Sequence, residues 1–590
     1  MDTRSSAGPR PRRLSGAVRT LAAPWAGRPG LAAPLLVAVL AAGATPAAAR
    51  PAPDPASPLP PLPGPAAGPA PWAHAVPLPD AQAPLAEAAR ELVLDQGPSP
   101  CAVGDDQDPF EVVDAFAARE MEGRGFPGAA IAIAVDGQIV HAKGFGVKHA
   151  VDGGDVDADT QFRFGSVLKM MTAAAVMQQV EAGKVDISAT VQTYVPDFTL
   201  ADADAAAAIT VWNLLTHSTG IPDLFTGLDV DGPKTDAALG EWAAGLGEVK
   251  PFAPPGSFWN YSNPNFSLAG LVAEGASGTP YHQLMADAVW ATAGMTSTTL
   301  LPGEVMDRGN YTFGHTVDFE TGQPAIVAPD SYDNWAFAPA GFGFTTAGDL
   351  ARWAALLMEG GGSVVSLESA AAMQDPQMPL QTTPDAYYGY GIMIEDYGDV
   401  VLRHHGGNIN GWGAYLLWVP EMDFAVATLN NADGNMISSV VCAVEAVLGV
   451  PPPATPDYTT DPATWGPYTG DYWVVDDLFS SRLEGLGPKE YVAQVTLEGD
   501  TLRLSLPDVT DPMSPTLSFS RTLTQVVLDT FAYDLDLDGN ADGTLAMTFI
   551  EDPADPGMAK WMRSRTYVGT RMVARPPRVY LPSLAKGEIR

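Results

Sequence analysis

Ser166 and Lys169, three residues apart, are the pair in this sequence best suited to covalent catalysis. On a helix this spacing places both side chains on one face, about a turn from each other. A serine hydroxyl is a weak nucleophile at neutral pH, but a neighbouring amine that is kept neutral can take its proton. The backbone N–H of a serine at a helix start also points outward, where it can hold an oxyanion. The pair therefore predicts acyl transfer to the serine oxygen.

The same four-residue pattern occurs a second time, at Ser583 to Lys586. That copy directly follows Pro582 and has no helical pattern after it. Ser166 instead follows the strand-like residues 162–165 and opens an apolar helical pattern. The apolar positions of this pattern are Met170, Met171, Ala174, Met177 and Val180. Context, and not the motif alone, favours Ser166 as the nucleophile.

Tyr261 and Asn263 form a second candidate group. A tyrosine beside a lysine can share a proton with it, because a cation lowers the phenol pKa. The asparagine amide could hold a carbonyl of the substrate. The spacing recurs at Tyr332 and Asn334, and either copy could be only a loop with a packed aromatic ring.

His405, Gly406 and Gly407 form a third candidate group, directly after the strand-like residues 400–404. Glycines on an edge strand let a substrate lie close to the backbone. The neighbouring His404 leaves a one-residue ambiguity about which histidine faces the site. In isolation the His-Gly-Gly sequence is more often a turn than a site.

Strand and helix patterns indicate how these groups are positioned. Apolar spacing predicts helices over 108–123, 166–182 and 436–448. Strand patterns occupy 129–135, 138–145, 390–395, 400–404, 413–418 and 424–429. The stretch from about 186 to 380 is mostly helix and loop. Strands at both ends of a helical middle predict one antiparallel sheet flanked by helices.

Five longer stretches together resemble the β-lactamase-related serine hydrolases, which include class C β-lactamases, D-alanyl-D-alanine carboxypeptidases and family VIII-type esterases. These stretches are 162–173, 214–223, 255–263, 341–351 and 405–412. The match at 255–263 favours Tyr261 over Tyr332. The resemblance covers about 108–450 and implies an α/β (α+β) sandwich, with an antiparallel sheet covered by helices beside a helical subdomain.

The resemblance also implies roles for individual residues. Ser166 would be the nucleophile, Lys169 its base partner, and Tyr261 the general base and acid. The substrate-binding positions would be Asn263, His405, Gly407 and Asn408, and the N–H groups of Ser166 and Asn408 would form the oxyanion hole. His217, within 214–223, would be structural and not part of a Ser/His/Asp triad.

His405 stands where the β-lactamases of this family place a lysine, which favours the esterase and peptidase members. The expected reaction is hydrolysis of an ester or amide, either a D-amino-acid or peptidoglycan-like peptide or a small ester, without a cofactor or metal. Two alternatives stay open. One is a β-lactamase, and the other is a catalytically silent penicillin-binding protein on the same fold.

Composition limits the partners and the location. The 590 residues carry a formal net charge of −37, which argues against nucleic acid or an anionic membrane as a partner. Residues 1–49 read as an export signal, with a basic leader, a short apolar stretch and a small-residue cleavage site. We therefore expect a secreted or cell-envelope protein with no stable membrane span, acting as a monomer.

The remaining segments complete the expected domain organisation. Residues 50–107 are a Pro/Ala-rich linker, 451–466 a second linker, 467–575 an all-β domain (a small barrel or a sandwich), and 576–590 a tail. Asp534 to Leu545 resembles a calcium loop, but an acidic β-turn is the alternative. Cys101 and Cys442 could pair in an oxidising compartment or stay as free thiols.

Overall fold

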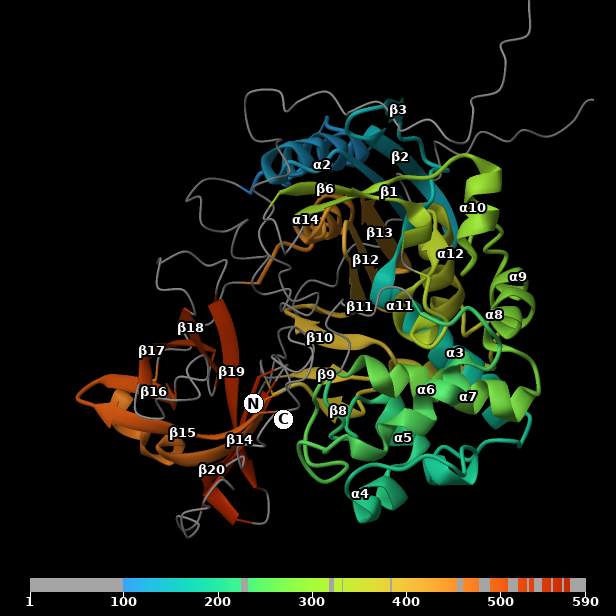
Figure 1. The fold of residues 1–590 in the computed structure, drawn as a ribbon. Helices are drawn as coiled ribbons and strands as arrows, with labels where there is room; N and C mark the ends of the chain where they lie inside the picture. The colour runs from blue at the N-terminus through green and yellow to red at the C-terminus, as the bar shows by residue number, and fades with distance from the viewer. Residues whose placement is uncertain are drawn as a thin grey trace, which may run out of the picture. The chain divides into compact units, whose positions relative to one another are not determined.

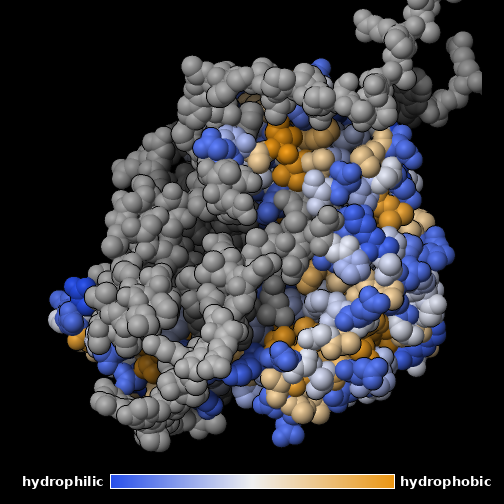
Figure 2. Space-filling model, in the orientation of Figure 1, coloured by the Kyte–Doolittle hydropathy of each residue, from blue (hydrophilic) through white to orange (hydrophobic). Residues whose placement is uncertain are grey.

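The computed structural model describes residues 99–104, 106–223, 232–317, 323–331, 333–381, 385–453, 460–476, 489–507, 518–527, 530–534, 544–552, 555–564 and 567–572 (Figure 1). The expected export signal, most of the first linker, the tail, and residues 535–543 of the calcium-like loop lie outside this description. Within these ranges, no helix is long and apolar enough to cross a membrane. On the face drawn in Figure 2, the described surface is largely hydrophilic, with apolar residues in small groups.

One nine-stranded sheet forms the centre of the first domain, in the order β3-β2-β1-β13-β12-β11-β10-β9-β8. Every neighbouring pair is antiparallel. The strands are β1 (Gly128–Val135), β2 (Gln138–His149), β3 (Gly153–Asp155), β8 (Met378–Pro379), β9 (Ala386–Tyr388), β10 (Met393–Tyr397), β11 (Val400–Ile409), β12 (Trp412–Val419) and β13 (Phe424–Asn430). Because β1 pairs with β13, the two ends of the domain meet in the middle of the sheet, which confirms the predicted fold class.

Strand β1 shows why the sheet is covered on both faces. From Ala130 to Val135 its residues alternate between alanine and a β-branched side chain, and all eight residues of the strand are buried. Successive side chains in a strand point to opposite faces. Ala130, Ala132 and Ala134 face the larger core, whereas Ile131 and Ile133 face the smaller one.

Helices pack on both faces of this sheet (Figure 1). Helices α2 (Pro109–Arg124) and α14 (Ile437–Leu448) supply the smaller core, and α3 (Leu168–Glu181) and α12 (Ala347–Met358) the larger one. The chain between α3 and α12 is mostly helix and loop, as predicted. Its helices are α4 (Ala203–Ala208), α5 (Val211–Leu215), α6 (Ala238–Ala244), α7 (Asn263–Ser277), α8 (Tyr281–Leu284), α9 (Ala291–Ala293), α10 (Pro302–Arg308) and α11 (Ala338–Gly341), with α13 (Leu367–Gln374) after α12.

One predicted strand, 390–395, starts too early. Strand β10 begins only at Met393, because Gly391 has φ 74°, a left-handed conformation that interrupts an extended chain. A methyl group at Gly391 would lie 2.8 Å from the backbone of Lys169, so the chain passes directly over α3 at this point.

The C-terminal region is an eight-stranded closed barrel, which confirms its predicted all-β character. Its strands are β14 (Gly470–Asp476), β15 (Lys489–Glu498), β16 (Thr501–Pro507), β17 (Ser518–Val527), β18 (Thr530–Asp534), β19 (Thr544–Asp552), β20 (Asp555–Arg563) and β21 (Tyr567–Arg571). Alternate side chains, among them Tyr472, Leu504 and Phe549, form one apolar core. An eight-stranded barrel encloses a volume that side chains can fill.

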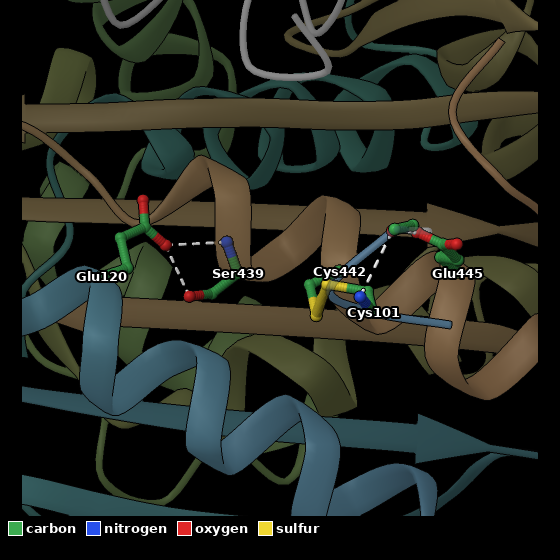
Figure 3. The surroundings of a disulfide bond; sticks show 6 residues. Cys101, Glu120, Ser439, Cys442 and Glu445 are labelled. Carbon is green, nitrogen blue, oxygen red and sulfur yellow. Dashed lines mark hydrogen bonds between the residues drawn. A yellow bond between two sulfur atoms is a disulfide. The ribbon is translucent and has the colours of Figure 1, made fainter. Parts of the chain in front are cut away.

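Cys101 and Cys442 form a disulfide, so the pairing that the sequence left open is present (Figure 3). It joins the segment before α2 to the middle of α14, 341 residues away. Two further contacts tie the same elements. Ser99 donates to Glu445 at 2.5 Å, and the buried Glu120 of α2 accepts from the backbone and hydroxyl of Ser439.

The disulfide closes a loop around almost the whole first domain, and its loss should therefore be costly. A long closed loop restricts the unfolded chain strongly, and removal of a native disulfide commonly costs about 2–5 kcal/mol. We expect the double variant Cys101→Ser/Cys442→Ser to unfold at a lower urea concentration than the oxidised protein. A thiol reductant should lower the midpoint of the native protein and leave that of the double variant unchanged. An equal midpoint for both proteins would show that the bond adds nothing to stability.

Candidate active site

Ser166 lies at a tight turn from strand to helix. The short strand β4 (Phe162–Arg163) pairs with β7 (Phe344–Thr345), and a 3₁₀ turn, η3 (Gly165–Val167), then leads into α3. Gly165 has φ 50°, and a methyl group there would lie 2.7 Å from the backbone nitrogen of Asn408. The predicted helix start is thus a 3₁₀ turn, and glycine is needed to bring Ser166 against β11.

Lys169 is completely buried beneath Ser166. Its Nζ lies 3.0 Å from Ser166 Oγ, 2.7 Å from Asn263 Oδ1 and 2.7 Å from the carbonyl oxygen of Ala340. An ammonium group has three hydrogens and no acceptor, so three acceptor oxygens suit its charged form. The geometry therefore fits a lysine that supplies positive charge to the site.

Tyr261 completes the cluster around the serine. Its hydroxyl is 2.7 Å from Ser166 Oγ, its side chain is almost fully buried, and Lys169 Nζ lies 4.8 Å from the ring centre. The tyrosine lies just before Ser262, the N-cap residue of the 15-residue helix α7, where the helix dipole favours negative charge. The lysine and the helix N-terminus therefore place positive charge beside a tyrosine whose hydroxyl donates to Ser166 Oγ. The competing Tyr332 lies outside the described residues.

Asn263, the first residue of α7, holds the lysine in place. Its Oδ1 accepts from Lys169, and its Nδ2 donates to Asp223 Oδ1 at 3.1 Å. The backbone N–H of Asn263 donates to the same carboxylate oxygen at 3.0 Å. The amide therefore has a buried carboxylate on one side and the ammonium on the other. Sequence reasoning quoted Asp223 within a longer stretch but did not predict this contact.

His405 lies on β11 and faces the cluster. Its Nδ1 donates to the carbonyl of Gly406 at 2.6 Å, and its Nε2 accepts from the hydroxyl of Tyr388 at 2.9 Å. Burial, together with the nearby Lys169, lowers the His405 pKa to about 3, so the ring is neutral. The sequence left open whether His404 or His405 faces the site. His405 does, because the His404 ring is hydrogen-bonded to Tyr415 instead. Both ring nitrogens of His405 have protein partners, and the residue is completely buried. Tyr388 was not singled out from the sequence.

Gly407 and Asn408 bring β11 directly against η3. A methyl group at Gly407 would lie 2.1 Å from the carbonyl oxygen of Phe164 and 3.0 Å from the Ser166 nitrogen. The backbone nitrogens of Ser166 and Asn408 therefore both lie where the main chains of η3 and β11 are in close contact. Among the described residues, no cluster of histidine, cysteine, aspartate and glutamate could hold a metal ion.

The C-terminal barrel reaches the wall of this site through Arg563 of β20. Its guanidinium donates to the carbonyl oxygens of Trp259 and Leu380 and lies 5.3 Å from the Trp259 ring centre. Trp259 is two residues before Tyr261, and both belong to the same apolar cluster as Leu380 and Tyr388. The barrel thus contacts the segments that carry Tyr261 and Tyr388.

The sheet, the helical region and the Ser-Lys-Tyr cluster define a serine hydrolase with the β-lactamase/transpeptidase fold. The family model described as Beta-lactamase matches residues 113–444, and the chain belongs to that family.

Two relatives and one solved structure illustrate the likeness. Penicillin-binding protein 4 of Amycolatopsis lactamdurans is 29% identical over 52% of this chain and 81% of its own length. An unguisins hydrolase of Aspergillus campestris is 28% identical over 55% of this chain and 61% of its own length. The crystal structure of SurE superposes with a TM-score of 0.60 and 22% identity, covering 78% of this chain and 98% of SurE, which shows a shared fold.

Proposed function

We propose that this protein hydrolyses esters or amides through an acyl-enzyme on Ser166. One observation carries the proposal: Ser166 Oγ lies 2.7 Å from the Tyr261 hydroxyl and 3.0 Å from Lys169 Nζ, at the start of a buried helix. A nucleophile within hydrogen-bond reach of its base, with that base oriented by a third group, is the arrangement of an activated serine.

In the first half of the reaction, the Tyr261 phenolate takes the proton of Ser166 Oγ while the oxygen attacks the carbonyl carbon. The N–H groups of Ser166 and Asn408 stabilise the oxyanion that forms. Tyr261 then gives its proton to the leaving alcohol or amine, and the carbonyl re-forms as an acyl-serine. In the second half, Tyr261 takes a proton from water as the water oxygen attacks the acyl carbon. It then returns this proton to Ser166 Oγ as the C–O bond breaks and the acid leaves. Lys169 stays charged and stabilises the phenolate throughout.

The neutral His405 supports a substrate without a carboxylate on the leaving-group side. The resembling β-lactamases place a lysine at this position, where a cation can attract such a carboxylate. Here burial lowers the ring's pKa to about 3, so the position carries no charge at any pH near neutral. Esters and D-amino-acid amides are therefore favoured over β-lactams and over peptides that end in a free carboxylate.

A matched pair of chromogenic substrates tests this preference. We expect the p-nitroanilide of D-alanine to be hydrolysed at least about tenfold more efficiently than its analogue with a carboxylate on the anilide ring. A tenfold ratio corresponds to a difference of about 1.4 kcal/mol in activation free energy. The measured quantity is kcat/KM for each substrate, with nitrocefin and p-nitrophenyl butyrate in the same panel. Preferential turnover of nitrocefin would instead establish a β-lactamase. Capture of fluorescent penicillin without turnover of any substrate would establish the silent binding protein.

We also propose that the protein acts outside the cytoplasm. The signal-like residues 1–49 and the disulfide between Cys101 and Cys442 support this location, because disulfides persist in oxidising compartments. Fractionation of the producing cells should find the oxidised protein, shortened at its N-terminus, in the envelope or medium. Full-length reduced protein confined to the cytoplasm would contradict the proposal.

A further inference from the structure

His217 holds the chain on both sides of Tyr261. Its carbonyl oxygen accepts from the backbone N–H of Asn260 at 2.8 Å, and its ring Nδ1 accepts from the backbone N–H of Ser262 at 3.2 Å. The residues immediately before and after the tyrosine are therefore hydrogen-bonded to the same histidine. Asn265 of α7 also contacts Nδ1 at 3.2 Å, which ties the imidazole to the first turn of that helix.

The imidazole also packs directly against the tyrosine ring. The two ring centres are 4.3 Å apart, and the His217 ring centre is 5.0 Å from that of Tyr388, the hydrogen-bond partner of His405. His217 is completely buried. One residue thus touches both tyrosines that face the active site.

The backbone of His217 is in an unusual conformation. Its φ is 52°, in the left-handed region that few residues other than glycine adopt, although histidine and asparagine enter it more readily than most. This conformation turns both its carbonyl and its ring toward the Tyr261 segment. Residues in such conformations persist only where surrounding contacts fix them.

We propose that His217 is a positioning residue that sets the Tyr261 hydroxyl against Ser166 Oγ. The proposal rests on the proposed acyl transfer. His217 acts through the placement of Tyr261, by two hydrogen bonds and one ring contact, and takes no proton from Ser166 itself. A base displaced by about 1 Å from its productive position can cost on the order of 100-fold in rate.

Three substitutions separate the two kinds of contact. His217→Asn keeps an acceptor where Nδ1 stands and tolerates the left-handed backbone, but it removes the ring. His217→Phe keeps a ring against Tyr261 and removes the acceptor, and His217→Ala removes both. We expect kcat to fall about 10- to 100-fold in the alanine variant with KM changed less than about threefold, and each partial variant to recover part of the loss. His141→Ala, on strand β2, is the matched control and should keep full activity.

A double-mutant cycle with Tyr261→Phe identifies the route of the effect. If His217 acts by placing the tyrosine hydroxyl, His217→Ala should have almost no further effect once that hydroxyl is gone. Fully additive losses, or a well-folded alanine variant with normal kcat, would overturn the proposal. The distance from Tyr261 Oη to Ser166 Oγ in a crystal structure of His217→Ala tests the positioning separately, even where the acyl-transfer proposal fails. A distance unchanged from that in the wild type would also overturn it.

Discussion

Ser166→Ala should lower kcat/KM for p-nitrophenyl esters by at least about 10⁴-fold, because no acyl-enzyme can form without the serine oxygen. The same change should abolish labelling by a fluorophosphonate probe, which reacts only with an activated nucleophile. The variant should remain folded, since the substitution removes a single small hydroxyl at the end of a well-packed helix. Stopped assays with purified protein and in-gel fluorescence measure the two effects.

The sequence offers a matched control for this variant. Ser583 begins the second copy of the same four-residue pattern, so Ser583→Ala makes an identical chemical change in an identical local motif. It should retain full turnover and labelling. Turnover retained by Ser166→Ala, or lost by Ser583→Ala, would remove Ser166 from the role of nucleophile.

Tyr261→Phe is expected to have the second largest effect, a fall in kcat of about 10²- to 10⁴-fold, which is the usual contribution of a general base. Phenylalanine keeps the ring against His217 and loses only the hydroxyl that lies 2.7 Å from Ser166 Oγ. A base must be deprotonated to act, so wild-type kcat/KM should fall as the pH drops below the apparent pKa of the Lys169–Tyr261 pair. The residual activity of the variant should lack this acid limb.

Tyr332→Phe is the corresponding control, because Tyr332 has the same spacing to an asparagine. It should leave both kcat and the pH profile unchanged. Should Tyr261→Phe keep an unaltered acid limb, another group would have to be the base, and Lys169 in a neutral form would be the first to test.

The central cluster could be predicted from the sequence because its residues lie in short, distinctive stretches. The spacing of Ser166 and Lys169 fixes their relation on one helix, and the resemblance over 255–263 selected Tyr261. The structure brings all three side chains together. The predicted strand at 400–404 was also confirmed, but β11 continues to Ile409, through the glycines that a turn would equally have suited. Their close contact with Phe164 and Ser166 explains the extended conformation, and no local pattern reports that contact.

Residues whose importance depends on distant partners could not be predicted. Asp223 matters because it meets Asn263, 40 residues away, and Tyr388 of β9 because it meets His405 of β11 across the intervening strand β10. The role proposed for His217 depends on a loop that carries Tyr261 more than 40 residues later. Each contact joins residues that are far apart in the sequence and meet only in the folded domain, so hydrophobic periodicity and local spacing carry no signal for it.

The contacts of Arg563 show that a residue outside the matched segment packs beside the candidate active site. The family match ends at residue 444, and every residue assigned to the reaction lies before that point. Yet the guanidinium of Arg563 is buried between the carbonyls of Trp259 and Leu380, on the apolar cluster that contains Tyr261. A protein cut after the matched segment would keep the whole catalytic motif set and leave those two carbonyls without their barrel partner. The barrel therefore contacts the apolar cluster around Tyr261, although it lies outside the matched segment.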